Sequence, residues 1–102
     1  MHYYRRALRL REDTGAGAAK IGEAMSELGY ALLFVGRFWT GRDLLMEGAD
    51  LLENAGGPGF RARALRKLSR GLSLTGRLSA ARDTLKRAEQ LAEQHRMFDQ
   101  LK

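Results

Sequence analysis

The sequence contains no cysteine, only one proline and no long apolar run. Without cysteine the chain can form neither disulfides nor thiolate metal sites, and a cytoplasmic location is the default expectation. The first residues lack the apolar core and small-residue cleavage site of a signal peptide. No apolar run approaches the ~20 residues of a membrane-spanning helix. We therefore expect a globular protein with no membrane partner.

Groups suited to catalysis are also scarce. The two histidines, His2 and His95, have no second ligand at metal-like spacing. Glu23 and Glu27 share a helical spacing, but no nucleophile or base lies beside them. The glycines of "GAGAAK" and "GGPG" do not end in the Gly-Lys-Ser/Thr of a P-loop, and they indicate inter-helix turns. We predict no enzyme, no cofactor and no metal site.

Positive charge is abundant but unevenly distributed. Residues 1–20 carry five basic and two acidic side chains, residues 21–60 carry two and six, and residues 61–102 carry eleven and four. An electrostatic partner would therefore be drawn to the last third of the chain. Fourteen of the eighteen basic residues are arginine, which suggests a GC-rich bacterial genome.

The apolar residues recur at helical spacing. Met25, Leu28 and Leu32 follow each other at steps of three and four, as do Leu65 and Leu68, and strand-like alternation is absent. Gly36 and Gly76 each follow such a segment and can end a helix in the left-handed conformation. The pattern predicts helices over residues 2–13, 18–35, 40–54, 60–75 and 79–96, and it allows a sixth that begins near Phe98.

These predicted helices repeat along the chain. Residues 25–55 align without a gap on residues 65–95 at a shift of 40, so that Leu28 falls on Leu68 and Leu32 on Leu72. The same shift places "GRF" at residues 36–38 on "GRL" at residues 76–78. A fixed period of this size is typical of a stacked helical array.

The repeated positions resemble the tetratricopeptide repeat family. The matching residues of the first copy are Met25, Leu28, Gly29, Leu32, Gly41, Leu45 and Gly48, and those of the second are Leu65, Leu68, Ser69, Leu72, Ala81, Leu85 and Ala88. The usual tryptophan, tyrosine and late proline are missing, and the period is 40 rather than 34 residues. The resemblance implies an all-α fold, a right-handed array of helical hairpins whose leucines form the core.

The resemblance also implies a domain organisation with open ends. A single domain over residues 1–102 would comprise an orphan helix (2–13), two repeats (18–55 and 60–96) and the start of a further helix (97–102). Such arrays need about three repeats and polar caps, so we expect self-association or neighbouring repeats of a longer chain. The apolar residues that could form this interface are Tyr3, Tyr4, Leu8, Trp39, Met97, Phe98 and Leu101.

In the tetratricopeptide family the first helix of each repeat lines a concave groove. Here we assign to this groove the positions of those helices that do not belong to the core. In the first copy these positions are acidic and aromatic and include Glu23, Ser26, Glu27 and Leu33, whereas in the second copy they are strongly basic. The predicted partner-binding residues are Tyr30, Phe34, Arg37, Arg63, Arg66, Lys67, Arg70 and Arg77. Forked arginine donors suit carboxylates or phosphates, so we hypothesise an acidic peptide partner. A merely solvated basic face is the alternative.

Three classes of function fit this sequence. The first is a protein-interaction scaffold, part or relative of a larger bacterial regulator. The second is a structural self-association module without a peptide ligand. Nucleic-acid binding is less favoured, because the central third is acidic and no recognition-helix motif is present.

The single tryptophan, Trp39, lies in the turn "VGRFWTG" beside Phe38. The alignment gives Phe38 the counterpart Leu78, which indicates a core residue, whereas Trp39 aligns with Ser79, a position that the family gives to exposed polar residues. Trp39 either folds back over its own neighbouring helix or serves as an exposed anchor for a partner or a second copy.

Overall fold

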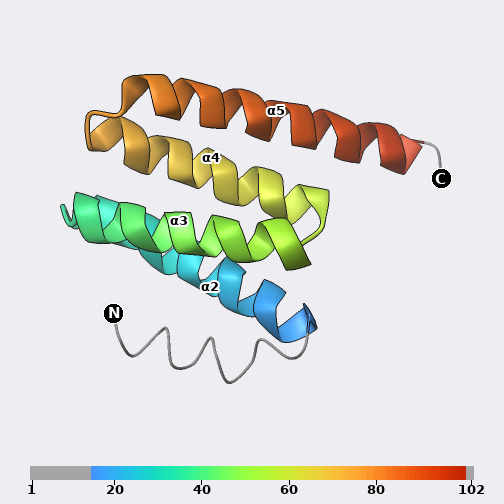
Figure 1. Cartoon of the computed structure of the whole chain (residues 1–102), viewed down its shortest axis with the longest axis horizontal. Coiled ribbons are helices and arrows are strands. Elements are labelled where there is room, and N and C mark those ends of the chain that lie inside the picture. Colours follow the sequence, from blue (N-terminus) through green and yellow to red (C-terminus); the bar gives the residue numbers. More distant parts are fainter. Residues whose placement is uncertain (1–14, 101–102) are drawn as a thin grey trace.

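The computed structural model describes the backbone of residues 15–100, which is helical apart from three short connections. The helices are α2 (Gly15–Phe34), α3 (Phe38–Ala55), α4 (Pro58–Leu74) and α5 (Leu78–Gln100). They lie side by side in chain order (Figure 1). The fold class of the described part is therefore all-α, as predicted.

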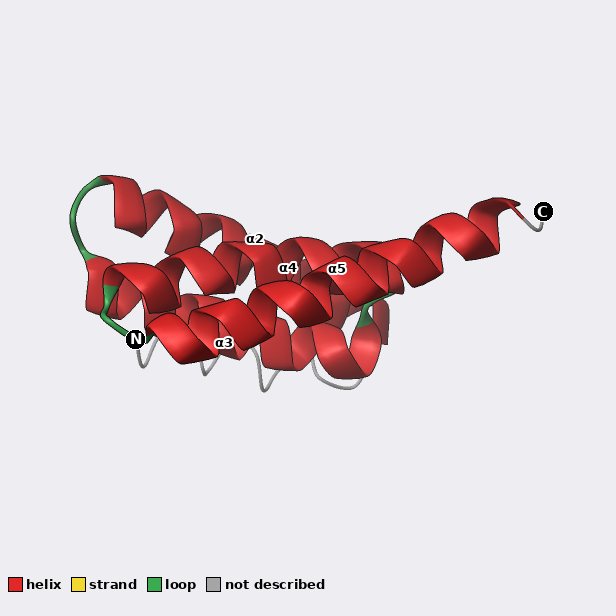
Figure 2. Cartoon of the chain, turned by 90° about the horizontal axis from the view of Figure 1, so that it is seen from above, coloured by secondary structure: helices red, strands yellow, loops and turns green. Residues whose placement is uncertain are grey.

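The four helices form two antiparallel hairpins. In the first hairpin α2 packs on α3, in the second α4 packs on α5, and α3 joins the two by packing on α4. The Cα atoms of α2 and α4 also approach within 8 Å, whereas those of α3 and α5 do not. Both hairpin turns lie at one end of the molecule, and the connection between α3 and α4 lies at the other (Figures 1 and 2).

The two hairpin turns have the same hydrogen-bond pattern. In the first, the Arg37 amide donates to the Leu32 carbonyl at 2.9 Å and the Gly36 amide donates to Leu33 at 3.3 Å. In the second, Arg77 donates to Leu72 at 2.8 Å and Gly76 to Ser73 at 3.2 Å. Both glycines have positive φ angles, 86° and 84°. Each turn is thus a Schellman motif in which a glycine takes the left-handed conformation, as the sequence predicted.

Small residues lie where the helices of each hairpin come closest. In the first hairpin, a Cβ atom on Gly29 would lie 2.7 Å from the Gly41 carbonyl oxygen. In the second hairpin, the corresponding positions are Ser69 and Ala81, and the Ser69 hydroxyl donates to the Ala81 carbonyl at 2.9 Å. Both pairs are buried, so the short side chains allow the backbones to approach.

The core lies between the two hairpins and within the first. Its main cluster joins Leu45 of α3 to residues of α2, α4 and α5, namely Leu33, Leu68, Leu72 and Ala81. A second cluster joins Met25 to Leu44. Phe38 is half-buried against the main cluster, which agrees with its assignment to the core.

Several predicted boundaries need correction. α2 begins at Gly15, so the "GAGAAK" segment is its first turns rather than an inter-helix turn. α3 and α4 each begin two residues earlier than predicted, and α5 begins one residue earlier. α5 also continues without a break to Gln100, which contradicts a further helix that begins near Phe98. The predicted helix over residues 2–13 lies outside the described residues.

The predicted core also differs in part from the observed one. Leu85 is 38% exposed, because no described helix covers the outer face of α5. Leu28 and Leu32 are only half-buried. Conversely, Ser26 and Leu33, which were assigned to the groove face, are buried between helices.

Among the described residues, no helix combines the length and the apolar character needed to cross a bilayer.

Candidate binding surface

A hollow of about 310 Å³ lies between α2 and α4. We call it the basic hollow; it is lined by Tyr30 of α2 and by Arg63, Arg66, Lys67 and Arg70 of α4. The structure therefore brings together five of the eight residues predicted to bind a partner.

The position of the four cations follows from the two faces of α4. On one face Leu68 and Leu72 are buried in the core. Arg63, Arg66 and Arg70 are three or four residues apart, which places them on a common face, and they are exposed. Burial of the leucine face against α3 and α5 thus holds the basic face outward.

Aromatic rings lie beside these cations. The Lys67 ammonium nitrogen is 5.7 Å from the centre of the Tyr30 ring. That ring contacts Phe34 edge to face, with 5.0 Å between the ring centres. The Arg63 guanidinium lies 5.7 Å from the centre of the Phe60 ring. These cation–π contacts stabilise the charged groups without cancelling their charge.

A second hollow of about 410 Å³ continues the basic surface along α4 toward α5. Arg63 and Arg66 line both hollows, and the second is completed by Gly59, Ala62, Ala92, His95 and Arg96. No acidic side chain lines either hollow among the described residues. The two hollows together form an extended cationic surface.

The acidic groups near this surface are few. Arg96 pairs with Glu93 at 2.6 Å. Glu23 lines a small space beside Arg63 and Lys67. Arg66 and Arg70 form no ion pair with the side chains that the structure describes. Much of the positive charge of the basic hollow is therefore left uncompensated by the described side chains.

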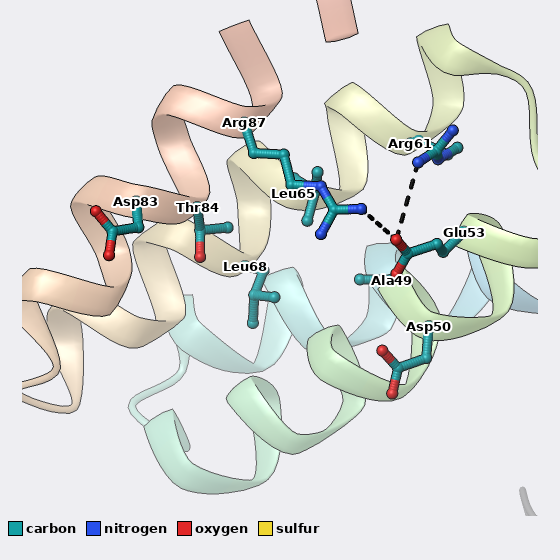
Figure 3. Close-up of a pocket in the computed structure, with 9 residues that line it drawn as sticks. All are labelled: Ala49, Asp50, Glu53, Arg61, Leu65, Leu68, Asp83, Thr84 and Arg87. Carbon is teal, nitrogen blue, oxygen red and sulfur yellow. Dashed lines mark hydrogen bonds and ion pairs between the residues drawn. The ribbon is translucent and has the colours of Figure 1, made fainter. Parts of the chain in front are cut away.

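A cleft elsewhere on the molecule, of about 310 Å³, shows the opposite electrostatic arrangement. It is lined by residues of α3, α4 and α5 (Figure 3). There Glu53 lies 3.9 Å from Arg61 and also pairs with Arg87. Because Glu53 and Arg87 are 34 residues apart, no local spacing in the sequence indicates this contact. Acidic and basic side chains thus share this cleft, and both of its arginines pair with Glu53.

The other predicted partner-binding residues lie elsewhere. Phe34 ends α2, Arg37 lies in the first hairpin turn and Arg77 lies in the second. All three are exposed and none lines either hollow. The predicted groove is therefore divided between the basic hollow and the end of the molecule that carries the turns.

Two of the predicted interface residues, Trp39 and Met97, have side chains in the described part of the chain. Trp39 is 61% exposed, and the Arg42 guanidinium of its own helix lies 4.7 Å from its ring centre. Trp39 is therefore not buried over a neighbouring helix. Met97 is exposed as well. The side chains of the remaining candidates, Tyr3, Tyr4, Leu8, Phe98 and Leu101, lie outside the described residues.

The chain matches no family model, and no curated protein or solved structure is significantly similar to it. Among the side chains that the structure describes, no group of three or more histidine, cysteine, aspartate or glutamate residues is placed to hold a metal ion.

Proposed function

We propose that the chain is a tetratricopeptide-like interaction module that binds an acidic peptide segment in the basic hollow. The observation that carries the proposal is the hollow itself, in which cations of α4 lie beside Tyr30 of α2. The module would act as a scaffold within a larger assembly rather than as an enzyme.

The arrangement of the helices supports the tetratricopeptide-like part of the proposal. The backbones of α2 and α4 approach each other more closely than those of α3 and α5. A row of hairpins spaced in this way curves toward the side of its first helices. The basic hollow lies between these first helices, where the family's groove is expected. The matching turns at Gly36 and Gly76 also agree with a period of 40.

The chemistry of the hollow supports an acidic ligand. Arginine guanidinium groups present forked donors that match carboxylates, and hydrogen bonds to ionised partners are the stronger kind. Arg66 and Arg70 have no acidic partner among the described residues, so a ligand carboxylate would not have to displace one. Tyr30 adds an aromatic wall that can contact the apolar part of a peptide side chain.

The proposal can be tested with a fluorescein-labelled peptide of aspartate, glutamate and glycine, using fluorescence anisotropy. Arg63→Glu combined with Arg66→Glu should weaken binding by at least about tenfold, because two charge-assisted contacts are replaced by repulsion. Arg82→Glu combined with Lys86→Glu makes the same change in net charge on exposed positions of α5. This control should retain most of the affinity.

Equal losses in the two double variants would show that only the overall charge attracts the peptide, and the basic hollow would then not be a site. A single-stranded oligonucleotide serves as a competing probe. Tighter binding of the oligonucleotide than of the peptide, with a steep salt dependence, would overturn the proposal in favour of nucleic-acid binding.

A further inference from the structure

The end of the molecule that carries both hairpin turns exposes large apolar side chains. Phe34, Val35, Trp39, Leu74 and Leu78 are between 44% and 71% exposed. We call these five residues the turn-end cluster. None of them lines the hollows or the cleft described above. Exposed apolar groups that gather at one place, unlike single ones, call for a binding partner.

The two turns are tied together by side chains. Arg42, in the first turns of α3, donates from Nη1 to the Thr75 hydroxyl at 3.4 Å. The Thr75 hydroxyl in turn donates to the Gly71 carbonyl at 2.9 Å. Two views at right angles place both turns at the same end (Figures 1 and 2). The apolar residues of the two turns therefore lie at the same end of the molecule, on turns that contact each other.

The same arginine fixes Trp39. The Arg42 side chain is 16% exposed, and Nη2 lies 3.5 Å from Asp43. Its guanidinium lies 4.7 Å from the centre of the Trp39 ring. A cation held by two neighbours thus supports the ring while most of the ring remains in solvent. Trp39 is positioned as a pre-arranged anchor rather than as a loosely exposed side chain.

The charge around the turn-end cluster is mainly positive. Residues 34–43 contain two basic and one acidic side chain, and residues 70–83 contain three and one. Arg37, Arg77 and Arg82 are all exposed. One of the two acidic groups, Asp43, already pairs with Arg42. The partner should therefore offer an apolar layer bordered by negative charge.

This combination identifies the kind of partner. A second copy docking by the same end would bring the two arginine rims together, and the like charges would repel. The cluster projects from helix ends and turns and lines no hollow. It is therefore better suited to insertion into the interface of a lipid bilayer than to binding a peptide. Tryptophan favours the bilayer interface, and arginine can extend its head to anionic lipid headgroups.

We propose that the turn-end cluster docks on an anionic membrane surface, with Trp39 entering the interface and the arginines of both turns contacting lipid headgroups. The proposal concerns peripheral attachment and departs from the sequence-based expectation of no membrane partner, because that expectation followed from the lack of a membrane-spanning apolar run, which peripheral attachment does not need. It does not depend on peptide binding in the basic hollow. Arg63 and Arg66, which carry the test of the hollow, lie outside the turn-end cluster.

Trp39 is the only tryptophan, so its fluorescence reports directly on this surface. The full chain is mixed with vesicles of phosphatidylcholine, with and without phosphatidylserine. We expect a blue shift with the anionic vesicles only, together with quenching by bromine-labelled lipid. The absence of both changes, or equal binding to neutral vesicles, would overturn the proposal.

Variants locate the contact. Phe34→Ser combined with Leu74→Ser keeps Trp39 and should lower the vesicle partition coefficient at least about tenfold, since two apolar groups no longer enter the interface. Met46→Ser removes an exposed apolar group from the middle of α3 and should change little. Equal losses would contradict the assigned site. Far-ultraviolet circular dichroism verifies that the variants are folded.

Two further outcomes would favour other partners and overturn the membrane proposal. A blue shift that grows with protein concentration in the absence of lipid would indicate a second copy. Loss of acidic-peptide binding in Trp39→Ser, without any vesicle binding by the unaltered chain, would make the turn-end cluster part of a peptide site. Loss of peptide binding confined to the Arg63 and Arg66 variant would leave this proposal unaffected.

Discussion

In the first hairpin α2 and α3 meet through glycines, whereas in the second α4 and α5 meet through alanines and a serine. A Cβ atom on Gly41 would lie 2.6 Å from the Gly29 carbonyl oxygen, so the backbones leave no room for even a methyl group. The corresponding position of the second hairpin holds Ala81, and the Ser69 hydroxyl donates to its carbonyl at 2.9 Å. One hairpin closes by backbone proximity and the other by a methyl group and a hydrogen bond.

The difference affects where each hairpin obtains its stability. Glycine inside a helix costs about 1 kcal/mol relative to alanine. The helices of the first hairpin therefore depend more on their packing than those of the second do. The close approach of the two backbones offsets the cost of these glycines, because it brings many atoms of α2 and α3 into van der Waals contact. Positions that match at a shift of 40 residues thus pack the two helices of a hairpin together in two different ways.

A second difference lies in what surrounds the hairpins. α3 is packed between α2 and α4, whereas α5 packs on α4 alone among the described helices. Leu45 of α3 is completely buried, but its counterpart Leu85 of α5 is 38% exposed. The edge face of α5 also carries Arg82 and Glu89.

The largest predicted change in the free energy of unfolding concerns these two leucines. Leu45→Ala leaves a cavity in the main core cluster and should lower the free energy of unfolding by about 2–5 kcal/mol. Leu85→Ala removes a side chain that is partly in solvent and should cost about 1 kcal/mol or less. Urea denaturation followed by circular dichroism measures both. Equal costs would mean that α5 is covered in solution, as self-association or neighbouring repeats would require.

The glycine contact gives the next largest effect. Gly41→Ala forces a methyl group against the Gly29 carbonyl and should destabilise by about 1–3 kcal/mol, despite the better helix propensity of alanine. Gly71→Ala is the matched control inside α4, because its Cβ would meet the movable end of Leu45 at 3.2 Å. We expect the control to stay within about 1 kcal/mol of the unaltered chain.

Denaturant midpoints compare the two glycine variants under the same conditions. If Gly41→Ala were as stable as Gly71→Ala, the helices of the first hairpin would be free to move apart. The distinction between the two ways of closing a hairpin would then be wrong.

Local sequence signals predicted much of this fold. The three- and four-residue spacing of Leu65, Leu68 and Leu72 identified a helix with one apolar face. The exposed arginines Arg63, Arg66 and Arg70 lie off that face. Gly36 and Gly76 marked the ends of helices, where their positive φ angles are now observed. These features depend on residues close in sequence, so one amino-acid sequence is sufficient to detect them.

Features that depend on neighbouring helices were harder to predict. Leu33 occupies a position that the spacing assigned to the groove, yet α3 and α4 bury it. Leu85 fits the core pattern but lies at an edge that no described helix covers. The Glu53 contacts with Arg61 and Arg87 join three helices. Such outcomes depend on how the hairpins stack, which the period alone does not specify.

The smallest effect concerns the serine of the second hairpin. Ser69→Ala removes the hydrogen bond to the Ala81 carbonyl, whose net contribution is about 0.5–1.5 kcal/mol. Alanine recovers about 0.5 kcal/mol through its higher helix propensity, so a net loss of about 1 kcal/mol or less is expected.

Ser69→Gly copies the first hairpin and should be worse than Ser69→Ala, because glycine adds a helix cost of about 1 kcal/mol relative to alanine while Ala81 still keeps the backbones apart. Thermal unfolding of the two variants in one buffer measures the order. A Ser69→Gly variant more stable than Ser69→Ala would show that α4 and α5 can approach each other as closely as α2 and α3 do. The two hairpins would then differ in their side chains but not in the packing that their backbones can reach.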